Sequence, residues 1–153
     1  MENMTYEEQT LALAELLVRT PPQELPALMA RERERFITAD RPFGAYFRRK
    51  LREKGILQQN VFLAADLGEN YGYKLLSEEK RTRRRDVILR LCLGARFAPE
   101  EIREALTLYG MAPLYARSPR DAVFLSAAGS GVFDVHEIHD LLVQNGLTGL
   151  FGE

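Results

Sequence analysis

Residues 43–109 contain five short segments in which apolar side chains recur every three or four positions, as on one face of a helix. Residues that cap or break helices separate these segments, among them Gly55, Pro99 and Gly110. The spacing predicts helices over residues 43–54, 56–65, 69–76, 84–93 and 99–109. No stretch sustains the alternation of a β-strand, so we expect an all-α fold.

Further helices are predicted on both sides of this region. Before it, Thr5 and Glu8 form a capping-box pattern that opens a helix to about Arg19. Thr20, followed by prolines, is a second N-cap candidate, for a short helix that carries Leu25, Leu28 and Met29. After it, we expect one helix over residues 121–128 and a last one that follows the Asp134-x-x-Glu137 capping pattern and ends near residue 145.

Length and composition fit one domain with extensions. The chain has 153 residues, 46% of them hydrophobic and 28% charged, a balance typical of folded globular proteins. No apolar run reaches the roughly 20 residues that a membrane helix needs, and the acidic start lacks the basic region of a signal peptide. We therefore expect a cytoplasmic protein. The single cysteine, Cys92, lies in an apolar run and is expected in the core.

The charge is strongly segregated along the chain. Residues 41–95 carry 13 basic and 6 acidic side chains, a net charge of +7, whereas each flanking segment carries 4 basic and 8 acidic ones, a net charge of −4. A basic segment within an acidic chain can form the electrostatic surface for a polyanion, although solvated arginine-rich helices produce the same pattern.

The central segment carries a family resemblance. The run ILQQNVFLAADLGENYGYKLLSEEKRTRRRDVILRLCLG resembles the second to fourth helices of Cro/λ-repressor-like (XRE-type) helix-turn-helix regulators. With the downstream runs PEEIREALTLYGMAPLY and PRDAVFLSA, residues 43–147 are similar to stand-alone helix-turn-helix proteins of Gram-positive bacteria. The resemblance implies a five-helix domain at residues 41–110. Residues 1–40 would be an N-terminal helical arm, and residues 111–153 two additional C-terminal helices packed on the domain.

The resemblance also implies a DNA-binding transcriptional regulator whose helix Glu69–Leu76 reads the major groove. Leu67 takes the apolar position of the turn, and Gly72 and Leu75 take the two inward positions. Asn70, Tyr73 and Lys74 would then be readers, because Asn pairs with adenine and Lys with guanine. Gln58 would contact the DNA backbone. The flanking phosphates would be bound by Lys80, Arg81, Arg83, Arg84 and Arg85.

An alternative is an interaction module that keeps this fold and binds a protein. Its motivation is the acidic charge of Glu69, Glu78 and Glu79 on the proposed DNA side. Glu78 and Glu79 are interpreted as a solvated loop. Tyr73, the acidic loop or the N-terminal helices of residues 1–40 would then hold the protein partner. The C-terminal helices either enlarge the core of a monomer or build a two-fold homodimer.

Enzymatic and metal sites find little support in the sequence. His136 and His139 share a helix face, but no matching Cys/His pair accompanies them. Gly129-Ser130-Gly131 lacks the frame of a nucleophile elbow, and no glycine-rich stretch continues into Lys-Ser or Lys-Thr. We expect a protein without enzymatic activity, cofactor or metal. The aromatic residues Phe43, Tyr46 and Phe47 are expected to pack in the core, and Tyr109, Leu114 and Tyr115 to fasten the C-terminal helices.

Overall fold

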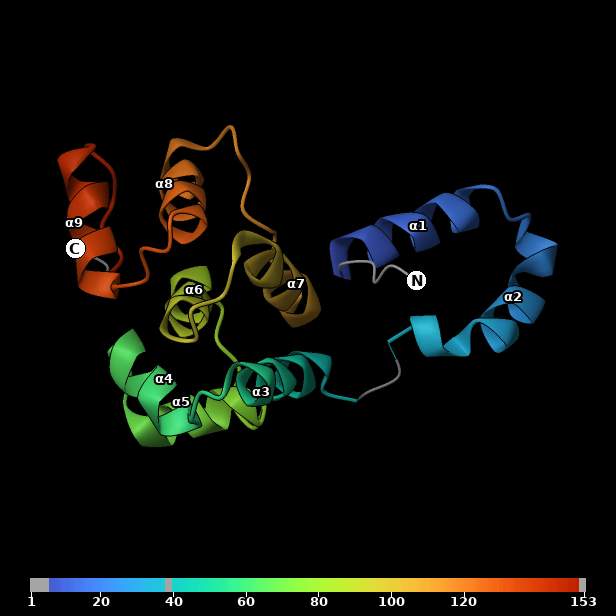
Figure 1. Cartoon of the computed structure of the whole chain (residues 1–153), viewed down its shortest axis with the longest axis horizontal. Coiled ribbons are helices and arrows are strands. Elements are labelled where there is room, and N and C mark those ends of the chain that lie inside the picture. The colour runs from blue at the N-terminus through green and yellow to red at the C-terminus, as the bar shows by residue number, and fades with distance from the viewer. Residues whose placement is uncertain (1–5, 38–39, 152–153) are drawn as a thin grey trace. The chain divides into compact units, whose positions relative to one another are not determined.

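The computed structural model describes residues 6–37 and 40–151, and these are helical with no β-strand (Figure 1). The all-α prediction is therefore confirmed for this part of the chain. The predicted Thr5 cap lies outside the described residues. The chain divides into two compact units, Met1–Asp40 and Arg41–Glu153, and each is described by itself.

The first unit, called the arm below, contains two α-helices and two 3-10 turns among its described residues, 6–37 and 40. These are α1 (Tyr6–Val18), η1 (Pro22–Glu24), α2 (Leu25–Arg31) and η2 (Arg33–Arg35). The predicted N-cap role of Thr20 is wrong. Its hydroxyl instead donates a hydrogen bond of 2.7 Å back to the carbonyl oxygen of Leu16, in the last turn of α1, and extended Pro21 precedes η1.

The second unit contains each helix predicted between residues 43 and 145. They are α3 (Pro42–Lys54), α4 (Gln58–Ala65), α5 (Glu69–Leu76), α6 (Arg85–Gly94), α7 (Pro99–Tyr109), α8 (Pro119–Gly129) and α9 (Val135–Gln144). The predicted bounds differ from these by at most two residues, and those of α5 and α7 agree. Helix α4, for example, begins at Gln58 rather than residue 56 because Leu57 is extended, with φ −80° and ψ 143°.

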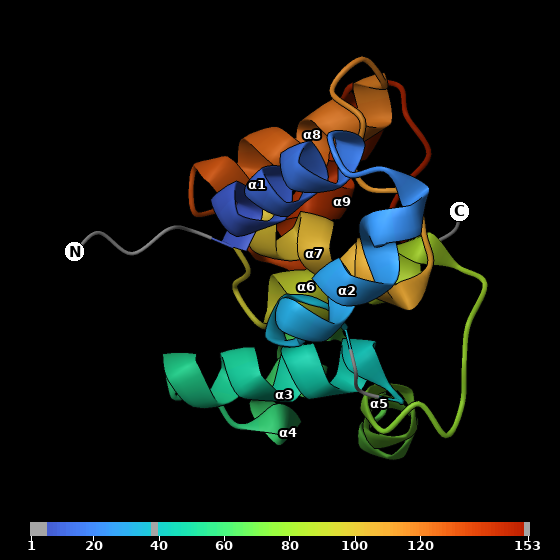
Figure 2. The same ribbon diagram turned by 90° about the vertical axis from the view of Figure 1, so that its right-hand side faces the viewer.

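One hydrophobic core runs through this unit. Phe43, Tyr46 and Phe47 of α3 are buried in it, as expected, and the ring of Phe47 packs 4.7 Å from that of Phe97. Helix α6 lies inside the unit and packs on α4, α7 and α9 (Figures 1 and 2). The C-terminal helices and the segment after them contribute to the same core, where their buried side chains are Phe124, Ala127, Ala128, Val135, Ile138, Leu142 and Leu150.

The pKa values of Cys92 and Glu101 are shifted in opposite directions by their surroundings. Cys92 is fully buried, as predicted, and burial raises the pKa of its thiol. Burial alone would also raise the pKa of the Glu101 carboxyl. The hydrogen bond from the Ala98 amide and the ammonium groups of Lys54 and Lys50 outweigh that effect and lower it. Because both lysines belong to α3, this ion cluster ties α3 to the start of α7.

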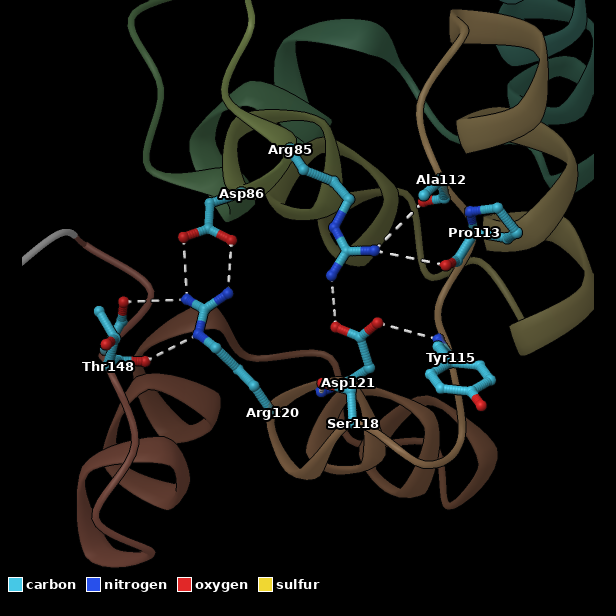
Figure 3. Close-up of polar contacts among 10 residues, drawn as sticks. Arg85, Asp86, Ala112, Pro113, Tyr115, Ser118, Arg120, Asp121 and Thr148 are labelled. Carbon is cyan, nitrogen blue, oxygen red and sulfur yellow. Dashed lines mark hydrogen bonds and ion pairs between the residues drawn. The ribbon is translucent and has the colours of Figure 1, made fainter.

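Two reciprocal ion pairs join the starts of α6 and α8 (Figure 3). Arg85 of α6 pairs with the buried carboxylate of Asp121, while Arg120 of α8 holds both oxygens of Asp86 at 2.8 Å. The Arg120 guanidinium also donates to the carbonyl oxygen of Thr148 at 3.0 Å. These ion pairs and hydrogen bonds join the C-terminal helices to α6.

Tyr109 and Tyr115 behave differently from each other, although both were expected to fasten the C-terminal helices. Tyr109 is buried, and its hydroxyl accepts a hydrogen bond of 2.7 Å from the Thr82 amide. The Tyr115 ring is exposed, so that part of the prediction is wrong. The Tyr115 backbone amide makes the fastening contact instead, by donating to Asp121 at 2.9 Å (Figure 3).

Replacing Asp121 with alanine is expected to lower the free energy of unfolding by about 3 kcal/mol, because Arg85 then loses its counterion within a partly buried site. Asp86→Ala is the matched control in the more exposed pair, with an expected loss of about half as much. Urea denaturation at neutral pH measures both. Equal losses would contradict a dominant role for the buried carboxylate.

Candidate nucleic-acid interface

Helices α4 and α5 are joined by a three-residue turn, Asp66-Leu67-Gly68, as the sequence predicts. Asp66 adopts the left-handed conformation with φ 57°, and its amide donates to the carbonyl oxygen of Leu63 at 3.1 Å. The Leu67 amide donates to Phe62 at 2.9 Å, which completes a Schellman motif. The Leu67 side chain packs against the core. The turn therefore both ends α4 and anchors the start of α5.

A glycine sets the close approach of α5 to α4. A Cβ atom at Gly72 would lie 2.3 Å from a ring carbon of Phe62, so only glycine fits there without displacing that ring. Gly72 and Leu75 are both buried, which confirms their predicted inward positions. The ring of Tyr73 packs edge-on against Phe62 with 4.9 Å between the centroids. Because its contacts are tight, α5 is held at a fixed angle to α4.

The C-terminal end of α5 is held by two arginines from the α3 region. Arg48 donates to the carbonyl oxygen of Leu76 at 2.8 Å, and Arg41 donates to that of Ser77 at 2.7 Å. Both cations also sit at the negative end of the α5 dipole, where positive charge is stabilising. Part of the basic charge of residues 41–95 therefore caps a helix and is not available to a ligand.

Glu78 lies in the same junction, and the interpretation of it as a solvated loop residue is wrong. Its side chain is only 8% exposed, and the backbone has the left-handed φ of 60°. One carboxylate oxygen accepts a hydrogen bond of 3.0 Å from the Gly44 amide in the first turn of α3, and the other pairs with Arg81 at 3.1 Å. Glu78 thus supplies the side-chain cap that α3 lacks at its own N-cap, and its charge is neutralised.

The outward face of α5 carries the predicted readers. Glu69, Asn70 and Tyr73 are exposed, and Lys74 is half-buried. Their polar side-chain groups have no hydrogen-bond or ion-pair partner among residues 6–37 and 40–151. Gln58, at the first turn of α4, is half-buried and likewise has no side-chain partner there. The outward face of α5 thus carries a row of polar groups without partners in the described chain.

The five basic residues predicted to bind phosphate separate into two groups. Lys80, Arg83 and Arg84 are exposed and have no side-chain partner within the described part of the chain. Arg81 donates to the carbonyl oxygen of Tyr109 at 2.7 Å and lies 4.1 Å from the centroid of its ring. Arg85 faces Asp121 and the carbonyl oxygens of Ala112 and Pro113 (Figure 3). Lys80, Arg83 and Arg84 therefore form the available cationic group.

Sequence reasoning missed the internal partners of Arg81 and Arg85. One signal for Arg85 was present: the dipeptide Arg-Asp occurs at residues 85–86 and again at 120–121, at the start of a helix each time. Two such starts facing each other allow a reciprocal exchange of charges. No comparable signal indicated Arg90, which donates to the carbonyl oxygen of Ala65 at 3.0 Å and so caps α4.

Among residues 6–37 and 40–151, no group of three or more metal-binding side chains is present. Nor does any helix in those ranges have the length and apolar character to cross a membrane. His139 instead accepts a hydrogen bond of 3.1 Å from the Leu150 amide. Comparison with known proteins found no match among protein-family models, curated proteins or solved structures.

Glu78→Ala is expected to lower the free energy of unfolding by about 2 kcal/mol, because the α3 cap and the partner of Arg81 are both lost. Glu79→Ala is the neighbouring control: this side chain is exposed and unpaired within the described chain, so a change below about 0.5 kcal/mol is expected. Thermal or chemical unfolding of the two variants measures the difference. Similar values for both would refute the capping role.

Proposed function

We propose that this chain is a DNA-binding transcriptional regulator that inserts α5 into the major groove of double-stranded DNA. Helices α3–α7 would form the five-helix Cro/λ-repressor-like arrangement, with α8 and α9 as additions. The observation that carries the proposal is the unpaired polar face of α5 on a helix whose inner face and both ends are fixed. A rigid helix with free polar side chains is the element that reads base edges in helix-turn-helix proteins.

Base reading is assigned to Asn70, Tyr73 and Lys74. Asn70 lies in the first turn of α5, the part of a recognition helix that reaches base edges, and its amide matches adenine. Lys74, one turn further along, can donate to guanine. The edge-on packing of Tyr73 on Phe62 limits its movement and leaves the exposed part of the ring for an apolar base contact.

Phosphate contacts are assigned to Lys80, Arg83 and Arg84, with Gln58 as a neutral contact at the start of α4. Arg81 and Arg85 are left out of this assignment because Tyr109 and Asp121 already hold their guanidinium groups. Such phosphate contacts fix the register of a protein on the duplex without reading its sequence.

The acidic residues on this side oppose DNA less than the sequence suggests. The charge of Glu78 is directed into the junction of α3 and α5 and is paired with Arg81. Glu69 stays exposed at the first position of α5, where a carboxylate can accept a hydrogen bond from the amino group of cytosine. Glu79 is the remaining exposed carboxylate of the loop.

A second candidate function is protein binding through the same helices. Leu63, near the end of α4, is 80% exposed and so places a large apolar side chain on the surface of the two helices. Tyr73 of α5 is exposed as well, and aromatic side chains are enriched in protein interfaces. Loss of partner binding on Leu63→Ala, with Arg83→Ala neutral, would favour this candidate.

The test is selection from a random duplex pool, followed by anisotropy titrations of the best duplex at several salt concentrations. Removing Arg83 and Arg84 together is expected to weaken binding to all duplexes and to lower the salt slope by about 1.8, or about 0.9 for each lost phosphate contact. Arg117→Ala is the control, because Arg117 is an exposed arginine without a partner in the described chain, distant in sequence from the proposed surface.

Asn70→Ala is expected to cost about 1–3 kcal/mol on the selected duplex and to relax specificity at one base pair. Its effect on non-specific duplexes should be small, which separates a reader from a phosphate contact. Failure to enrich any duplex, or equal effects of the Arg83/Arg84 and Arg117 variants, would overturn the proposed function.

A further inference from the structure

The large apolar side chains of the arm are left exposed or half-buried, with one exception. Residues 11–37 contain ten Leu, Ile, Val, Met or Phe residues, and of these only Leu28 is buried. Leu11 is 60% exposed and Val18 is 86% exposed, and Met29 and Ile37 are exposed as well. Four exposed large apolar side chains on so short a segment make it a candidate interface.

The two α-helices of the arm pack only loosely against each other. Contact between α1 and α2 is marginal, and Figure 1 shows them as the two limbs of an open hook. A hollow of about 520 Å³ lies between them, lined by the apolar Leu16, Ala27 and Leu28 together with polar residues. Segments below about 40 residues do not build a sufficient core alone, so the arm needs a second surface to bury its apolar face.

The charge of the arm is divided between an acidic α1 and a more basic segment after it, so two arms can be electrostatically complementary. Helix α1 contains three glutamates and no basic residue. Residues 19–37 contain four arginines and three glutamates, and one of those glutamates, Glu32, already pairs with Arg31 and Arg35. When two arms pair antiparallel, the acidic α1 of each copy faces the more basic half of the other, whereas α1 against α1 would repel.

We propose that the arm is a homodimerisation element, which pairs with the arm of a second copy of this chain. The two copies are related by a two-fold axis, and α1 of each packs against the α2 region of the other, so that four α-helices enclose one apolar core. Because of the two-fold axis, each contact between the arms occurs twice, so the buried apolar area is doubled. The occupant of the arm's apolar face is the same face of its partner.

The experiment is sedimentation of the full chain over micromolar concentrations, without DNA, so that its outcome is independent of the proposed function. The wild type is expected to be dimeric. The double variant Leu11→Glu with Val18→Glu is expected to raise the dimer dissociation constant by at least about 100-fold, because four carboxylates would enter the apolar interface. Both positions are exposed, so the helix content seen by circular dichroism should stay unchanged.

Val143→Glu is the matched control, a 55% exposed apolar position on α9 of the other unit. It should leave the dimer intact, whereas Met29→Glu on α2 should weaken the dimer as the α1 variants do. A chain that sediments as a monomer at every concentration overturns the proposal. So does a dimer that survives the α1 substitutions, or one that is lost with Val143→Glu.

Discussion

The exchange of charges between two Arg-Asp dipeptides places the starts of α6 and α8 against each other. The amino ends of two helices both carry partial positive charge and would repel if nothing lay between them. Asp86 and Asp121 each lie in the first turn of their own helix, where a carboxylate is favourable, and each accepts an arginine from the other helix. Four residues thus convert a repulsive approach into an attractive one.

This arrangement determines where the basic loop of residues 77–84 can lie. The loop arcs from the end of α5 to the start of α6 (Figure 2). Its first end is held by Arg41 and Arg48, and its last residue adjoins Arg85, which is locked to Asp121. Between these points, Arg81 and Thr82 are bound to Tyr109. The cations that remain outside, Lys80, Arg83 and Arg84, are therefore presented by a loop with fixed ends.

Local patterns predicted the helices well because caps, prolines and glycines act on their immediate neighbours. The inward positions of Gly72 and Leu75 followed from helical spacing in the same way. The roles of charged residues were harder to predict. The internal partners of Arg81 and Arg85 lie 28 and 36 residues away in sequence, and Glu78 reaches its cap site only through a left-handed backbone that a glutamate rarely adopts. Apart from the repeated Arg-Asp dipeptide, long-range partners of this kind leave no local pattern, so the sequence could suggest a basic surface but not which arginines belong to it.

The burial of Cys92 makes its thiol a probe for the opening of the core. It is the only thiol in the sequence, it lies in the middle of the shared core, and its raised pKa keeps it protonated. Reaction with a thiol reagent requires the thiolate in contact with water, so labelling has to wait for the core of residues 41–153 to open. The rate of that labelling therefore measures how fast the second unit opens.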